Sequence, residues 1–309
     1  FMLKKFTLCV STMFFVSAIF APGAEIAQDK NALKGFVFNN PENFKEFTNF
    51  HGGAGTIKYN EYWGPDDYDV QHQFFRVVMI PPKCSIGEYR LVDSDEVMVL
   101  LSGYAFVTVK GRTGALVEDT LVPIQMGETI GIYNPTNEDV SLVWVATVTE
   151  KGKYNPVDLN NDLTKQRPEG VIPFPHIYLN YWIFEPSENP SHKGLGSLVE
   201  TLGTVDFNYF KTGLHSRFFI VPQGASIGYH THYTNEEHFF IVKGTGRGTV
   251  NDVTMTLNPL DCIKCGIDDS HGIYNNGNED VVIFFTNLPL PGVKNWGRVE
   301  DLGDNLSNR

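Results

Sequence analysis

The strongest constraint in this sequence is that it repeats itself at a fixed spacing of 141 residues. The segment Gly-Ile-Tyr-Asn stands at residues 131–134 and again at 272–275, and Ser-Ile-Gly stands at 85–87 and again at 226–228. The same offset holds without a gap from residue 51 to residue 140. A repeat of this length corresponds to a whole domain and not to one unit of a solenoid. The chain is therefore interpreted as a tandem duplication of one domain.

Both copies have the pattern of short β-strands. Runs of β-branched and aromatic residues, such as residues 217–222 and 280–286, are separated by Gly, Pro, Asn and Asp. The 29 glycines and 17 prolines indicate many turns, and helical periodicity is weak. Short strands at this spacing predict an all-β fold of the sandwich or barrel type in each copy.

The ends of the two domains follow from the repeat and from local composition. Lys4 and Lys5 precede an apolar stretch and the small residues 21–24, which is the pattern of a secretory signal peptide at 1–23. An uncleaved membrane anchor is the alternative. We expect an N-terminal domain at 33–150, a polar linker at 151–175, a C-terminal domain at 176–300, and a secreted or periplasmic protein.

The charge of the chain limits its partners. The sequence has 36 acidic and 24 basic residues, a formal net charge of −12. Such a surface argues against nucleic acid, and against an anionic membrane once the signal is removed. A small-molecule substrate or ligand is expected, and a homo-oligomer is allowed.

The second copy holds a group of residues typical of a metal site. His230 and His232 are two positions apart, so on a strand both side chains project from one face. A turn at residues 233–235 is needed to bring Glu237 to the same face, and His271 would approach from another strand. Three imidazoles and one carboxylate suit one divalent transition metal, with Fe, Mn, Ni, Cu and Zn not distinguished.

These spacings resemble the motifs of the cupin superfamily. Its first motif, G(x)5HxH(x)3–4E(x)6G, is matched at every position, and its second, G(x)5PxG(x)2H(x)3N, is matched at His271 and Asn275. The second motif departs at Leu260, Gly266 and Asp268. The resemblance implies a bicupin: two tandem double-stranded β-helix (cupin jelly-roll) domains, packed through their sheets, with the ion held in a barrel mouth.

The first copy lacks the same group. At the fixed offset His230, His232 and His271 are replaced by the residues Tyr89, Leu91 and Ile130, and the carboxylate persists as Glu96. Leu and Ile cannot bind a metal, so the N-terminal copy is predicted to be metal-free. Features that both copies share are interpreted as structural first; these are the pairs Arg76 and Arg217, Asn134 and Asn275, and His51 and His192.

Several neighbours of the motif have less certain roles. Tyr229, Glu236 and His238 have the opposite strand parity to the adjacent ligand, which predicts that they point away from the metal. Asp268 or Asp269 could act as a general base, although carboxylates in turns are usually exposed. Cys262 and Cys265 form a CxxC in a strand-like stretch, where their separation of about 10 Å favours packing thiols over redox chemistry.

The resemblance implies a metal-dependent enzyme of the dioxygenase, decarboxylase, lyase or isomerase class, acting on a small oxygen-rich substrate. No catalytic residue is assigned. The alternatives are a non-catalytic ligand-binding or storage-type bicupin, a carbohydrate-binding or carbohydrate-modifying protein, and a ureidoglycine aminohydrolase-like hydrolase, whose ligand set includes a Gln that is absent here.

Overall fold

The computed structural model describes residues 35–168, 179–180, 184–186, 190–201, 208–294 and 296–309. Over these residues the chain is all-β, as predicted, with five short 3-10 helices and no α-helix. No helix within the described part of the chain is long and apolar enough to cross a membrane. The predicted signal peptide at 1–23 lies outside the described residues.

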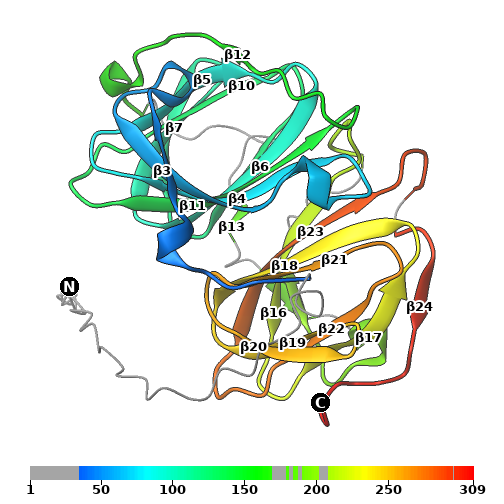
Figure 1. Ribbon diagram of the computed structural model, residues 1–309. Coiled ribbons are helices and arrows are strands. Elements are labelled where there is room, and N and C mark those ends of the chain that lie inside the picture. The colour runs from blue at the N-terminus through cyan, green and yellow to red at the C-terminus, as the bar shows by residue number, and fades with distance from the viewer. Residues whose placement is uncertain (1–34, 169–178, 181–183, 187–189, 202–207, 295) are drawn as a thin grey trace, which may run out of the picture.

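The N-terminal barrel is built from two antiparallel sheets (Figure 1). A seven-stranded sheet has the order β13-β9-β6-β11-β4-β3-β2, and a five-stranded sheet has the order β12-β5-β10-β7-β8. The strands are β2 (Lys45–Thr48), β3 (Thr56–Trp63), β4 (His72–Ile80), β5 (Ser85–Arg90), β6 (Ser94–Ser102), β7 (Tyr104–Val109), β8 (Arg112–Val117), β9 (Thr120–Ile124), β10 (Thr129–Tyr133), β11 (Val140–Val148), β12 (Val157–Asp158) and β13 (Leu179–Asn180).

The C-terminal barrel repeats this arrangement. Its seven-stranded sheet has the order β1-β21-β18-β23-β16-β15-β14, and its five-stranded sheet has the order β20-β19-β22-β17-β24. The strands are β1 (Phe36–Val37), β14 (Phe184–Pro186), β15 (Val199–Thr201), β16 (His215–Val221), β17 (Ser226–His232), β18 (Asn235–Lys243), β19 (Gly246–Val250), β20 (Val253–Leu257), β21 (Cys262–Cys265), β22 (Ser270–Tyr274), β23 (Val281–Pro289) and β24 (Val299–Asp301). The predicted pair of jelly-roll barrels is confirmed.

Each half of the chain contributes one edge strand to a sheet of the other barrel. β1, from the stretch assigned to the first domain, pairs with β21 of the C-terminal barrel. β13, from the stretch assigned to the second domain, pairs with β9 of the N-terminal barrel. β12 comes from the segment expected to be a linker, and it joins β5 in the five-stranded sheet. The strands of each barrel therefore do not all come from one side of the domain boundaries expected from the sequence.

The seven-stranded sheets are buried on both faces. Phe239 packs inside the C-terminal barrel, whereas the next residue, Phe240, packs between the barrels with Phe75, Phe218 and Phe284. Alternate residues of one strand thus enter different cores, which explains apolar runs without polar alternation. Complete burial of each such side chain contributes about 1.5–3 kcal/mol.

One glycine in each barrel permits a close backbone approach next to the motif strand. A Cβ on Gly87 would lie 2.0 Å from the carbonyl oxygen of His51, and one on Gly228 would lie 2.1 Å from that of His192. Both histidines have a φ of 51°, in the left-handed region. This contact brings the two histidines against strands β5 and β17, and explains why the repeat preserves both pairs.

Candidate metal centre

Four side chains meet at one end of the C-terminal barrel. One ligand-capable atom from each of the residues His230, His232, Glu237 and His271 lies within 4.8 Å of the others, and all four residues are buried. β17 supplies the two histidines of the HxH pair, β18 supplies the carboxylate, and His271 on β22 stands directly opposite His230 in the ladder. The sequence-predicted set is therefore brought together, and this group could hold a metal ion.

The histidines are oriented by backbone carbonyls. The Nδ1 atom of His230 lies 2.8 Å from the carbonyl oxygen of Gly228, and that of His271 lies 3.1 Å from the oxygen of Asp269. A hydrogen on each Nδ1 leaves the Nε2 lone pair to act as a ligand. The Nε2 atom of His230 is buried with no hydrogen-bond partner in the structure. A buried polar atom without a partner is rare, and a metal ion would satisfy it.

The protonation states also suit a metal. Burial lowers the pKa of His230 and of His232, which favours neutral imidazoles. Burial alone would raise the pKa of Glu237, but His232, His271 and His230 lower it below its usual range. The two carboxylate oxygens lie 3.2 Å from Nε2 of His232 and 3.1 Å from Nε2 of His271. Neutral imidazole and carboxylate are the forms that bind divalent transition metals.

Asn287 supports the carboxylate from a neighbouring strand. Its side-chain amide on β23 donates a hydrogen bond of 2.6 Å to an oxygen of Glu237. The corresponding residue in the first copy is Ala146, so this amide is special to the second copy. Asn287 lies outside both sequence motifs, and its difference from Ala146 is the signal in the sequence that could have identified it.

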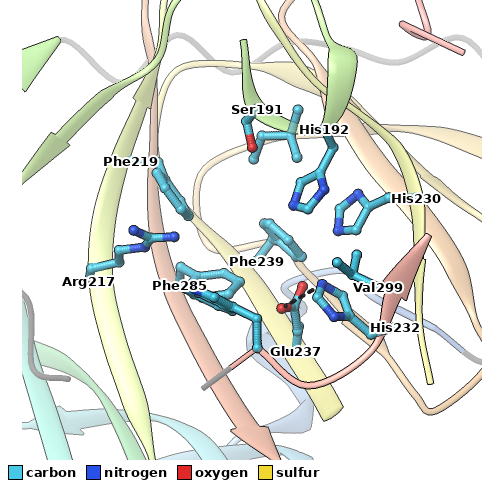
Figure 2. A pocket seen from close by; sticks show the side chains of 12 residues that line it. Ser191, His192, Arg217, Phe219, His230, His232, Glu237, Phe239, Phe285 and Val299 are labelled. Atoms are coloured by element: carbon cyan, nitrogen blue, oxygen red, sulfur yellow. Dashed lines mark ion pairs between the residues drawn. The ribbon is translucent and has the colours of Figure 1, made fainter. Parts of the chain in front are cut away.

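A cavity of about 210 Å³ adjoins the metal-capable group (Figure 2). His230, His232 and Glu237 form part of its wall. The remaining lining is mostly apolar and comes from the residues Ser191, His192, Arg217, Phe219, Ile227, Phe239, Phe285, Trp296 and Val299. An ion at this group would thus face a small pocket with hydrophobic walls.

His192 has both a structural role and a place in the cavity. Its ring stacks on that of His230 with centroids 3.6 Å apart, and its Nδ1 lies 2.8 Å from a carboxylate oxygen of Asp301. In the first copy His51 stacks on Tyr89 at 4.0 Å and contacts Asp158 in the same way. The repeated geometry supports the structural interpretation of both, and His192 in addition lines the cavity, which its place in the repeat did not predict.

Arg217 also differs from its twin. Arg76 in the first copy donates from Nε to Glu61 at 2.6 Å and lies over Phe74. Arg217 lines the cavity, with its guanidinium carbon 4.3 Å from the ring centroid of Phe219. The structural interpretation drawn from the shared arginine therefore omitted its position in the cavity.

The strand-parity predictions are correct. Glu236 accepts hydrogen bonds of 3.1 Å from the backbone N–H groups of Asp69 and Val70, in the N-terminal barrel. His238 likewise faces that barrel, with Nε2 3.1 Å from the hydroxyl of Tyr68. These side chains fix the outer face of β18, whose inner face carries Glu237.

The other candidates lie away from the cavity. Tyr229 contacts Asp252, and neither Asp268 nor Asp269 is part of the cavity lining. The amide of Asn275 donates to two backbone carbonyls, which is a structural role. The cysteines of the CxxC, Cys262 and Cys265, are buried free thiols.

In the N-terminal barrel the equivalent glutamate, Glu96, is satisfied by three hydrogen bonds. The carboxylate of Glu96 accepts from the hydroxyl of Tyr89 at 2.6 Å, from the indole of Trp144 at 2.9 Å and from the hydroxyl of Tyr154 at 2.8 Å. Across the described residues, the group in the C-terminal barrel is the one cluster of metal-capable side chains. The equivalent buried glutamates of the two barrels, Glu96 and Glu237, therefore have different partners.

Comparison with known proteins agrees with this architecture. The cupin domain family matches residues 217–287. Among solved structures, the chain is similar to a deletion mutant of Bacillus subtilis oxalate decarboxylase, with a TM-score of 0.57 and 14% identity, covering 93% of this chain and 89% of that one. No curated protein matches the sequence.

Two further structures share the fold. Vicilin from hazelnut (Corylus avellana) has a TM-score of 0.58 at 12% identity, covering 82% of this chain and 86% of that one. The formate complex of Lactobacillus farciminis oxalate decarboxylase has a TM-score of 0.56 at 16% identity, with coverages of 84% and 87%. At such identities the likeness concerns the fold, which enzymes and storage proteins share.

Proposed function

We propose that this chain, in which residues 217–287 match the cupin domain family and the whole has the bicupin fold, is a metal-dependent enzyme with one mononuclear site, located in the C-terminal barrel. The substrate is a small oxygen-rich molecule, and the reaction is of the dioxygenase, decarboxylase, lyase or isomerase class. The observation that carries the proposal is the convergence of four buried ligand atoms within 4.8 Å beside a cavity.

The proposed ligands are His230, His232, Glu237 and His271. When bound, a divalent transition metal would supply Lewis-acid chemistry, or redox chemistry if it is Fe, Mn or Cu. Mn(II) is the first metal to test, since the oxalate decarboxylase of Bacillus subtilis carries Mn(II) centres. The buried Nε2 of His230, which has no other partner, supports this assignment.

The residues around the ligands have separate tasks in this proposal. Asn287 fixes the carboxylate of Glu237, and His192 holds the ring of His230 by stacking. The aromatic wall of Phe239 and Phe285 excludes water, which strengthens electrostatic interactions within the cavity. The N-terminal barrel supports the outer face of β18 and takes no direct part.

Secretion is part of the proposal and rests on the pattern of residues 1–23 alone. The division of the chain into a first domain at 33–150, a linker at 151–175 and a second domain at 176–300 likewise stays a proposal. Within the proposed linker, β12 has a counterpart in β24: the two strands add to equivalent sheets and supply the aspartates that hold His51 and His192.

The decisive experiment is a turnover screen with metal-loaded protein. Full-length protein is reconstituted with Mn(II), Fe(II) or Zn(II) and incubated with small carboxylates, enols and ureides, while oxygen uptake, carbon dioxide and ammonia are followed. A reaction that needs the metal and is lost in His232→Ala supports the enzyme. Ammonia release from ureidoglycine would favour the hydrolase. Protein that takes up none of these metals and turns over none of the compounds would favour a storage-type bicupin.

A further inference from the structure

A polar layer lies behind the metal-capable group, on the face of the C-terminal barrel that is turned toward the N-terminal barrel. In Figure 1 the strands β18, β21 and β23 form this face, and their outer apolar residues share one core with the other barrel. Neighbouring residues of a strand project from opposite faces, so His238 lies on the outer face of β18 and Glu237 on the inner face. The place of the ligand carboxylate therefore depends on what holds the outer face of its strand.

Two adjacent cross-strand pairs of β18 and β23 connect the two faces. In the inner pair Glu237 stands opposite Asn287, and in the outer pair His238 stands opposite Thr286. The inner pair is joined by the 2.6 Å hydrogen bond to the carboxylate. In the outer pair, Nδ1 of His238 lies 2.9 Å from the hydroxyl oxygen of Thr286. Both pairs share one stretch of backbone, so a displacement of the outer pair also displaces the carboxylate.

Tyr68, in the loop between β3 and β4 of the N-terminal barrel, holds the outer pair in place. Its hydroxyl lies 3.1 Å from Nε2 of His238, so both ring nitrogens of this buried histidine have a partner. The loop is itself docked on the same sheet. Glu236 accepts two backbone hydrogen bonds from it, and the ammonium group of Lys264 donates to the carbonyl oxygen of Asp67. These contacts fix the hydroxyl of Tyr68 against β18.

The first copy has a different outer layer at the equivalent positions. At the offset of 141 residues, His238, Thr286 and Asn287 are replaced by the apolar residues Val97, Val145 and Ala146. The tyrosine is kept as Tyr209, whose hydroxyl is buried without a hydrogen-bond partner among the described residues. The tyrosine therefore belongs to the shared fold, whereas its polar partners belong to the copy that carries the metal-capable group.

We propose that Tyr68 is a positioning residue for the metal centre, because through the outer pair it sets the place of the Glu237 carboxylate. This inference rests on the proposed function, since it concerns the affinity of the four ligands for a metal ion. It gives the N-terminal barrel a specific task in metal binding, beyond the covering of an apolar face. Coupling between two sites is reciprocal, so metal binding should in turn hold the loop at residues 65–70 more firmly.

The test is the affinity of the full-length protein for Mn(II), or for Zn(II) if the parent does not retain Mn(II), measured by competition with a chelator. The variant Tyr68→Phe keeps the ring and removes only the hydroxyl that reaches His238. Two other tyrosines are matched controls. Tyr209→Phe removes the twin hydroxyl, and Tyr62→Phe removes a different bond between the barrels, the 2.6 Å hydrogen bond to the carbonyl oxygen of Leu260. Thermal unfolding of the metal-free proteins shows whether each variant is folded.

Tyr68→Phe is expected to weaken metal binding by about 2- to 30-fold, the range for substitutions that act on a site through intermediate side chains. The electron paramagnetic resonance spectrum of bound Mn(II) should change as well, because the carboxylate moves relative to the imidazoles. Tyr209→Phe and Tyr62→Phe should bind the metal as the parent does, even where they lower the melting temperature. In a His238→Val background, which lacks the connecting side chain, Tyr68→Phe should have no further effect.

Hydrogen exchange measures the coupling from the other barrel. The amide hydrogens of Asp69 and Val70, which are donated to Glu236, should exchange more slowly in the metal-loaded parent than in the metal-free parent. The difference should be smaller in Tyr68→Phe.

Three results would overturn the inference and leave the proposed metal site standing: parental affinity in a folded Tyr68→Phe variant, an equal loss of affinity in Tyr62→Phe, or exchange at Asp69 and Val70 that does not respond to the metal. A parent that retains neither Mn(II) nor Zn(II) would refute the proposed function, and this inference with it.

Discussion

The buried glutamate of the N-terminal barrel, Glu96, leads to a measurable prediction about stability. Burial raises the pKa of Glu96 to about 7, and the hydrogen bonds from Tyr89, Tyr154 and Trp144 offset only part of this effect. In the folded chain Glu96 therefore keeps its proton to higher pH than in the unfolded chain. The stability that this group contributes is fully present below about pH 4.5 and is lost as the pH rises through about 7.

The magnitude follows from the two pKa values. A change from 4.5 to about 7 corresponds to about 3 kcal/mol in the free energy of unfolding. The substitution Glu96→Gln removes the titration but keeps an acceptor for the tyrosine and tryptophan donors. Between pH 4 and pH 8 the variant should therefore gain up to about 3 kcal/mol of stability relative to the parent chain.

Denaturant unfolding of both chains at a series of pH values measures this difference. The exposed carboxylate of Glu42 provides a matched control, because Glu42→Gln should leave the pH dependence of the parent unchanged. A constant stability difference between Glu96→Gln and the parent from pH 4 to pH 8 would show that the buried carboxylate titrates as it does in water.

Two further substitutions test the architecture of the C-terminal barrel. Asn287→Ala removes the 2.6 Å hydrogen bond to Glu237, so metal affinity measured by chelator competition should fall about 10- to 100-fold; unchanged affinity would refute the positioning role. Gly228→Ala would place a Cβ 2.1 Å from the backbone oxygen of His192, so it should destabilise the fold by about 1–3 kcal/mol or more; a melting temperature equal to that of the parent would contradict this.

Most of the architecture was predictable because a duplicated sequence shows each constraint twice. The fixed offset separated what both barrels need, such as Asn134 and Asn275, from what the second barrel alone carries. The spacing of His230 and His232 placed both on one face of a strand, as β17 has them. Strand parity also placed Glu236 on the outer face, where it contacts the other barrel.

Comparison of the two copies did not reveal where residues at equivalent positions have different roles. Arg76 and Arg217 occupy equivalent positions, and the repeat alone did not show that Arg217 lines a cavity. Trp296 and Val299 enter the cavity from a segment beyond residue 281, where the sequence match at the fixed offset has ended, so the motif comparison did not reach them. The edge strand β1 is short and pairs with a partner more than 200 residues away, so local pattern could not predict it.

Metal stoichiometry shows whether the C-terminal barrel binds one ion and the N-terminal barrel binds none. Full-length protein is saturated with Mn(II), desalted and analysed for metal, together with the matched variants His230→Phe and Tyr89→Phe, which introduce the same side chain at equivalent positions of the two barrels. We expect one ion per chain in the parent, one in Tyr89→Phe and none in His230→Phe. Two ions per chain, no ion in the parent, or full retention in His230→Phe would contradict this expectation.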